Sequence, residues 1–252
     1  MAGVCRRFLP AAIAAVAIVV PTAATPRTLA VPILMYHRVG QVMAGEPAIT
    51  RALTVATSVF AAQMEWLKRS GFHAITLREL YDALEHGGPL PPHPIAITFD
   101  DGYRDVLWNA APLLHRLHMP ATDFVISGRV DDGDPSFLSW PELRRLEGMG
   151  FAIGSHTVHH LELTLLPKAQ ARYELDASRS ALMAHLHEPV SWFAYPSGRT
   201  DALVVALVRR AGYLAAVTTE PGVEQNGRQP FLLHRDAVYS WTGLHTLQEL
   251  LG

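Results

Sequence analysis

Short apolar runs alternate with longer amphipathic stretches along most of this chain. The apolar runs lie at 31–36, 74–76, 95–99, 121–126, 151–154, 192–195, 213–217 and 231–238. Several are apolar almost throughout, which is typical of strands buried on both faces. Strands that alternate with helices run parallel and are joined by crossover helices. The pattern therefore predicts an α/β barrel or a doubly wound sheet, and the spacing alone does not decide between them.

Helix signals fill the intervals between these strands. A stretch from 58 to 69 keeps its apolar residues on one face, and Gly71 stands where a helix would end. The tetrapeptides at 76–79 and 139–142 each begin with Thr or Ser and end with Glu, which is the pattern of a capping box. We therefore expect helices to begin at both places.

Residues 1–30 are typical of a secretory leader. Two arginines precede an apolar run from 8 to 20, and small residues follow, with Ala24 and Ala30 as candidate cleavage points. An uncleaved membrane anchor is the alternative, but a span needs about 20 apolar residues and this run is shorter. We predict export to the periplasm, the cell envelope or the medium, with peripheral or no membrane contact after the leader is removed.

Residues 31–252 are predicted to form a single domain. The only cysteine lies within the leader, so a mature domain would contain no disulfide. A formal net charge of −2 supplies no basic surface for nucleic acid, so no nucleic-acid partner is expected.

Two adjacent carboxylates, Asp100 and Asp101, end the apolar run at 95–99 and are followed by a glycine turn. Adjacent like charges at the end of a core strand repel each other, so such a pair suggests a cation or another functional role. A structural role remains open for one of them, because aspartate is a favoured N-cap residue and a helix is expected near Tyr103.

Two histidines, His156 and His160, follow the apolar run at 151–154. Histidines four residues apart share one face of a helical turn and can hold one metal ion, although a chance pair is common in a chain with 13 histidines. In barrels and open parallel sheets the carboxyl ends of the strands lie on the functional side.

Together, the two motifs offer two imidazoles and one carboxylate for a metal, with one carboxylate left over. Three protein ligands and an open position are typical of catalytic zinc, and the remaining aspartate would take a proton from water. Residues 192–198 form a third strand-to-turn segment, whose Pro-Ser-Gly turn can direct backbone N–H groups at an oxyanion.

These segments resemble the first three motifs of the NodB-homology polysaccharide deacetylases, carbohydrate esterase family 4. The segments are Thr98–Tyr103, His156–His160 and Phe193–Gly198, and the opening Ile33–Val39 resembles the branch that deacetylates poly-β-1,6-N-acetylglucosamine. The resemblance runs from about residue 31 to 240. It implies a distorted (β/α) barrel of about seven parallel strands, TIM-like and in a single domain.

The resemblance also implies roles for individual residues. Asp100 would be the general base, while Asp101, His156 and His160 would bind Zn²⁺ or another divalent ion such as Co²⁺ or Ni²⁺. The backbone N–H of Ser197 would line an oxyanion hole.

The chain departs from the family pattern at two positions. Ala194 stands where the family has an arginine that orients the catalytic aspartate, and Arg235 is our candidate replacement. Ser197 stands in place of an aromatic residue. For the general acid we favour His37, at the end of the first predicted strand, over His234 in the last one.

The predicted activity is the removal of N-acetyl groups from a polysaccharide, first of all an N-acetylglucosamine polymer, then peptidoglycan or chitin-type oligomers, and last acetyl esters of xylan. A catalytically silent glycan-binding module on the same scaffold is the main alternative, because Ala194 departs from the pattern. A ferrous oxygenase uses the same ligand types, but its all-β setting disagrees with the strand–helix alternation.

Overall fold

The computed structural model describes residue 3 and residues 27–252, so most of the predicted leader lies outside the described residues. Its central feature is a parallel sheet in the order β10-β9-β8-β7-β6-β2-β12, with β5 (His73–Ile75) beside the start of β6. The strands in that order are β10 (Ala215–Val217), β9 (Trp192–Ala194), β8 (Phe151–Ser155), β7 (Ala121–Val125), β6 (Pro94–Asp101), β2 (Ile33–Tyr36) and β12 (Asp236–Ala237). The predicted distorted barrel is confirmed, in a single domain.

The segment from Phe231 to Val238 closes the ring of strands. Its first part pairs with β10, since the Leu233 N–H donates to Ala216 O at 3.0 Å and the Thr218 N–H to Leu233 O at 2.9 Å. Its second part is β12, which lies parallel to β2 with Asp236 opposite Leu34. The prediction of one strand over 231–238 is therefore wrong, because this segment crosses from one neighbour to the other.

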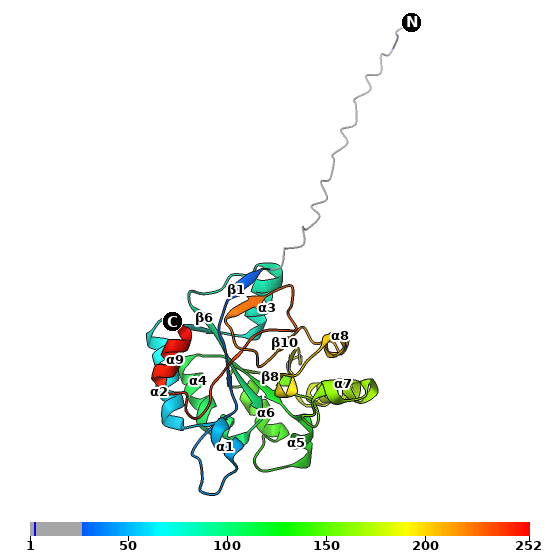
Figure 1. Cartoon of the computed structure of the whole chain (residues 1–252). Helices are drawn as coiled ribbons and strands as arrows, with labels where there is room; N and C mark the ends of the chain where they lie inside the picture. Colours follow the sequence, from blue (N-terminus) through cyan, green and yellow to red (C-terminus); the bar gives the residue numbers. More distant parts are fainter. Residues whose placement is uncertain (1–2, 4–26) are drawn as a thin grey trace.

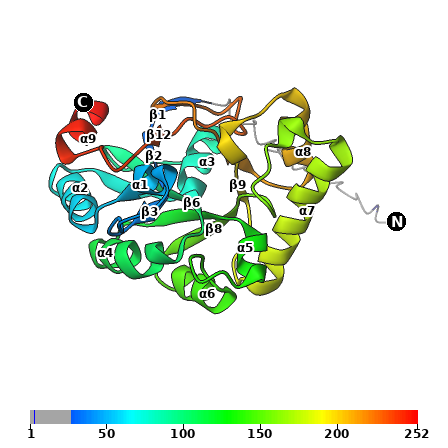
Figure 2. The same ribbon diagram turned by 60° about the horizontal axis from the view of Figure 1, so that its bottom comes forward.

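Helices surround this sheet (Figures 1 and 2). The longer ones are α2 (Thr57–Arg69), α3 (Leu77–His86), α6 (Trp140–Glu147), α7 (Lys168–His185), α8 (Ala202–Arg210) and α9 (Leu244–Leu251), and the shorter ones are α1 (Ala48–Leu53), α4 (Ala111–Leu117) and α5 (Ser127–Asp132). Helix α9 packs beside α2 at one side of the barrel (Figure 1). Both predicted capping boxes are present, at the starts of α3 and α6.

Three short elements and two small sheets complete the fold. A π-helical turn lies at Val106–Ala110, and 3-10 turns lie at Leu163–Leu165 and Pro196–Gly198. Strand β1 (Thr28–Ala30) pairs antiparallel with β11 (Glu224–Asn226), while β3 (Arg38–Val39) pairs with β4 (Thr54–Val55). Residues 28–30 of the predicted leader are thus part of the folded structure.

Apolar side chains fill two regions, as expected for strands buried on both faces. One cluster lies between strands and helices and includes Phe60, Phe99 and Phe151. The other includes Phe124 and Leu233, from strand β7 and the closing segment. Among the residues that the structure describes, no helix combines the length and apolar character needed to cross a membrane.

Candidate active site

The two adjacent carboxylates lie at the end of β6 and line the same cavity. Asp100 is 3% exposed and Asp101 is 8% exposed. Neighbouring side chains of a regular strand point to opposite faces. Here the backbone turns into the left-handed region, with φ of 79° at Asp101 and 78° at Gly102. This departure from strand geometry explains how both carboxylates reach one cavity.

Asp100 forms a two-pronged ion pair with Arg235, which is fully buried. The Arg235 Nη1 and Nη2 atoms each lie 2.7 Å from an oxygen of Asp100, and Nε donates to the Thr218 carbonyl at 2.9 Å. Burial alone would raise the pKa of Asp100, but the guanidinium outweighs it and lowers this pKa to about 2. Arg235 thus keeps Asp100 in its charged form. This is the contact for which Arg235 was our candidate, in place of the arginine missing at Ala194.

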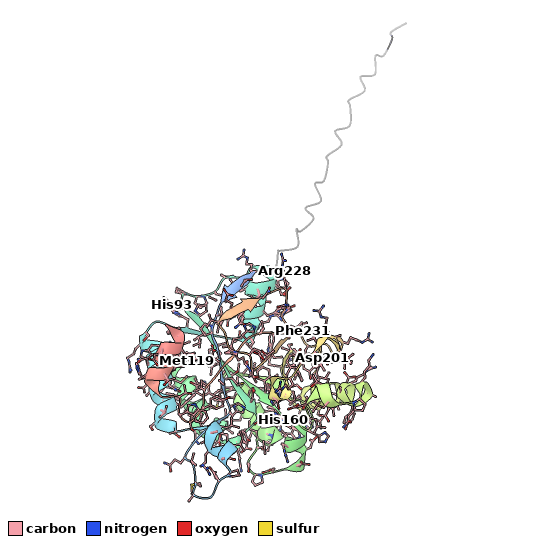
Figure 3. The ribbon with its side chains drawn as sticks, in the orientation of Figure 1. His93, Met119, His160, Asp201, Arg228 and Phe231 are labelled. Carbon is pink, nitrogen blue, oxygen red and sulfur yellow. The ribbon has the colours of Figure 1, made fainter. Side chains whose placement is uncertain are left out.

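His156 and His160 converge on Asp101 from the loop that follows β8, where Figure 3 labels His160. Their Nε2 atoms lie 3.6 and 3.7 Å from Asp101 Oδ1, which is buried and has no hydrogen-bond partner among the described residues. The Nδ1 atom of His156 lies 2.8 Å from the Ala194 carbonyl, so Nε2 keeps its lone pair for the cluster.

The donor atoms of this cluster fit a divalent metal. Ligands about 2.1 Å from a tetrahedral zinc lie about 3.4 Å from one another, close to the separations found here. Burial lowers the pKa of His156 to about 3 and also lowers that of His160, while it raises the pKa of Asp101 to about 6. Neutral imidazoles and an unpartnered carboxylate oxygen are the donors that such an ion requires.

The predicted helical turn between the two histidines is wrong. Residues 156–160 form a loop, with left-handed φ values of 69° at Thr157 and 59° at His160. His156 and His160 come together through this loop conformation and not through the spacing of a helix. His159 lies apart from the cluster, because its Nδ1 contacts Glu174 Oε1 at 2.7 Å.

A cavity of about 630 Å³ opens above the cluster. The two aspartates at the end of β6 and the two histidines after β8 all line this cavity. Its polar lining includes His37, Asp100, Asp101, His156, His160 and Ser197. The Nδ1 atom of His37 is buried and lacks a hydrogen-bond partner within residues 27–252. His234 instead lines a separate cavity of about 250 Å³. Ser197 lies in the turn after β9 with φ of 56°.

Two buried carboxyl groups near the site were not foreseen from the sequence. Asp123 on β7 is fully buried, and Glu174 on α7 is 1% exposed. Asp123 interrupts the apolar run at 121–126, and Glu174 interrupts the apolar face of a helix. An acidic residue at an otherwise apolar position is the signal that could have identified both.

Asp123 is expected to destabilise the fold at neutral and alkaline pH. Neither of its carboxylate oxygens has a hydrogen-bond partner among the described residues, and burial, followed by the charges of Asp100 and Asp101, raises its pKa well above the usual value. A raised folded-state pKa means that stability falls as the pH rises from about 4 toward that pKa. Asp123→Asn should therefore increase the free energy of unfolding at pH 8 by about 1–3 kcal/mol.

Chemical denaturation at several pH values checks this expectation. The difference between Asp123→Asn and the unchanged protein should shrink as the pH is lowered toward 4, because the unfolded chain then also begins to protonate this carboxyl group. A difference that is constant across this range would show that Asp123 does not titrate as described.

The sequence is similar to those of known proteins. Residues 87–216 match the family model described as polysaccharide deacetylase. The chain is 31% identical over 214 residues to YxkH of Bacillus subtilis (strain 168), a polysaccharide deacetylase by family, covering 85% of this chain and 73% of that protein. It is 27% identical over 220 residues to the poly-β-1,6-N-acetyl-D-glucosamine N-deacetylase of Staphylococcus aureus (strain COL), covering 78% and 74%.

A solved structure has a similar fold. The Streptococcus pyogenes deacetylase PplD, determined in complex with acetate, superposes with a TM-score of 0.82 at 27% identity. The superposition covers 90% of this chain and all of that one.

Proposed function

The chain belongs to the polysaccharide deacetylase family, and from this premise we propose that it hydrolyses N-acetyl groups on an N-acetylglucosamine polymer with the help of a divalent metal ion. The observation that carries the proposal is the Asp101–His156–His160 cluster beside the Asp100–Arg235 ion pair in one cavity. The Staphylococcus aureus relative, which acts on such a polymer by name, supports this choice of substrate.

Asp101, His156 and His160 would hold the ion, with Zn²⁺ first and Co²⁺ or Ni²⁺ as alternatives. When bound, it supplies Lewis acidity that makes a water molecule more acidic and polarises the acetyl carbonyl. The Ala194 carbonyl keeps His156 oriented through Nδ1.

Asp100 is the group that takes the proton from water. Its ion pair with Arg235 keeps it unprotonated at neutral pH, but the low pKa also makes it a weak base. Proton transfer to Asp100 therefore depends on a water molecule of increased acidity. The Ser197 N–H would stabilise the oxyanion that forms when water adds to the acetyl group.

His37 would donate the proton that the departing nitrogen requires. An amide nitrogen must be protonated to leave, and His37 lines the same cavity as Asp100 and Asp101. We expect His37→Ala to lower turnover at least about 100-fold with metal content unchanged. His234→Ala should lower turnover clearly less, because His234 lines the smaller cavity. Steady-state rates of both variants test this, and the opposite ranking would refute the assignment.

Acetate release tests the proposed function as a whole. The protein is incubated with poly-β-1,6-N-acetylglucosamine, peptidoglycan, chitin oligomers and acetylated xylan, with and without a chelator. We expect release from the first substrate above all, and loss of release after chelation that added Zn²⁺ or Co²⁺ restores. A glycan-binding module without activity would bind these polymers and release no acetate. Arg235 weakens this alternative, because it supplies Asp100 with the cation that Ala194 cannot.

Export of the protein is a further part of the proposal. Because Thr28–Ala30 pair with β11, cleavage after Ala24 keeps this strand in the mature protein, whereas cleavage after Ala30 would remove it. We therefore expect the exported protein to begin at Thr25. N-terminal sequencing of the protein from the medium or the cell envelope checks this, and a full-length, membrane-embedded chain would indicate an anchor instead.

A further inference from the structure

We infer that Glu174 is a positioning residue for the metal site, holding the loop at 157–160 in the conformation that brings His156 and His160 together. This inference rests on the proposed metal dependence. It concerns a side chain that touches neither the substrate nor the proposed ion.

Glu174 occupies a place in α7 where the fold otherwise buries small or apolar groups. The buried face of this helix consists of Ala171, Glu174, Leu175, Ser178 and Leu182. Burying a carboxyl group is costly unless hydrogen bonds replace its contacts with water. Glu174 is only 1% exposed, so its partners identify what it does.

Within the described part of the chain, all the hydrogen-bond partners of Glu174 belong to the loop that carries the histidines. Its Oε2 accepts from the N–H groups of Val158 and His159, at 3.0 and 2.9 Å, and its Oε1 lies 2.7 Å from Nδ1 of His159. A carboxylate suits this position because it only accepts hydrogen bonds. Glu174 therefore holds the peptide units between the two proposed ligands.

These peptide units need to be held because the loop is strained. Thr157 and His160 both have left-handed φ values, 69° and 59°. Such a conformation is unfavourable for any residue other than glycine, and it is unusual for a β-branched residue such as Thr157. It persists only where the surroundings fix it. A relaxed loop would move His160 away from Asp101.

Helix α5 holds the other side of the same loop. The N–H groups of Ser127 and Gly128 donate to the carbonyls of Thr157 and Val158, at 3.1 and 3.0 Å. A side chain at Gly128 would collide with the Val158 carbonyl, so the approach requires glycine. The loop thus lies between donors from α5 and acceptors from Glu174 on α7, and removing either set frees one side.

The decisive variant is Glu174→Leu, which removes every acceptor and places an apolar side chain on an already buried face. The change leaves the N–H groups of Val158 and His159 without their acceptor, so some loss of stability is expected whatever the role of Glu174. We expect the variant to remain folded with a lowered thermal unfolding midpoint, and metal binding is measured well below that temperature. Its dissociation constant for Zn²⁺ should rise by about 10–100-fold, the usual effect of losing a group that orients a metal ligand.

Titration of the metal-free protein with Zn²⁺ against a competing chelator measures this constant, and the visible absorption of the Co²⁺ form reports the ligand geometry. Glu174→Gln, which keeps part of the acceptor capacity, should give a smaller loss. Ser178→Ala is the matched control, because Ser178 is buried one turn further along α7 and bonds Ser155 at the end of β8, without a hydrogen bond of its own to Val158 or His159.

A zinc affinity of Glu174→Leu within about threefold of the unchanged protein would overturn the inference, since orienting groups normally contribute more. So would an equal loss in Ser178→Ala, which would indicate general loosening of the helix. If Glu174→Leu does not fold, Glu174→Gln carries the same comparison. If the unchanged protein binds no divalent ion, the proposed metal-dependent function is wrong. If it binds the ion and Glu174→Leu binds it equally well, only the inference about Glu174 is wrong.

Discussion

Replacing Asp100 with asparagine is expected to reduce deacetylation by about 10³–10⁴-fold while the protein still binds its metal. Asparagine keeps the size of the side chain but cannot take a proton from water at neutral pH. The proposed ligand set of Asp101, His156 and His160 is untouched by this change. Two measurements on the same purified sample check this. The metal content should be unchanged, and the rate of acetate release should be strongly reduced.

The matched variants are those of the ligands. Asp101→Ala, His156→Ala and His160→Ala should each lose metal together with activity. His159→Ala should retain the metal, because His159 contacts Glu174 and lies outside the cluster. Full metal occupancy in His156→Ala would show that the site is wrongly assigned.

Loss of Arg235 should affect both stability and catalysis. Arg235→Met leaves the carboxylate of Asp100 buried without a cation, and breaking such a pair by removing one partner costs about 3–5 kcal/mol of unfolding free energy. The pKa of Asp100 should rise, since burial remains and the guanidinium does not. We expect turnover to fall by at least about 100-fold, because Asp100 loses the group that orients it and is more easily protonated.

A double-mutant cycle separates the two effects. Asp100→Asn combined with Arg235→Met removes both charges, so much of the lost stability should return while activity stays absent. Arg235→Lys keeps the charge but cannot form two parallel hydrogen bonds, and it should be intermediate. Near-normal turnover of Arg235→Met would mean that the ion pair serves the fold alone.

The sequence predicted the strands better than it predicted the loops that carry the site. Strands buried on both faces leave an apolar signature, and the predicted runs therefore end within one residue of the ends of β7 and β8 and two residues before the end of β6. The loop at 156–160 has no such signature, because its shape depends on bonds to α5 and to Glu174. An i, i+4 spacing consequently identified the two histidines that cluster with Asp101, but through a helical geometry that the loop does not have.

The closing segment shows a second limit of local patterns. Residues 231–238 are apolar enough to suggest one strand, yet they pair first with β10 and then with β2. Only the arrangement of the whole ring decides where such a segment changes partners. Arg235 lies at this change, and its contact with Asp100 was expected from two signs, the missing arginine at Ala194 and the place of Arg235 in a late predicted strand.

The position of Arg235 also sets an order of events during synthesis. The chain leaves the ribosome from its N-terminus, so Asp100 emerges long before the segment that closes the ring. Until residues 231–238 follow, β10 and β2 keep open edges and the buried carboxylate of Asp100 has no counter-charge. A partly made chain therefore lacks what stabilises the barrel, and it should stay unfolded until this segment emerges. Under the proposed export, this delay would keep the growing chain in an unfolded form that can cross a membrane.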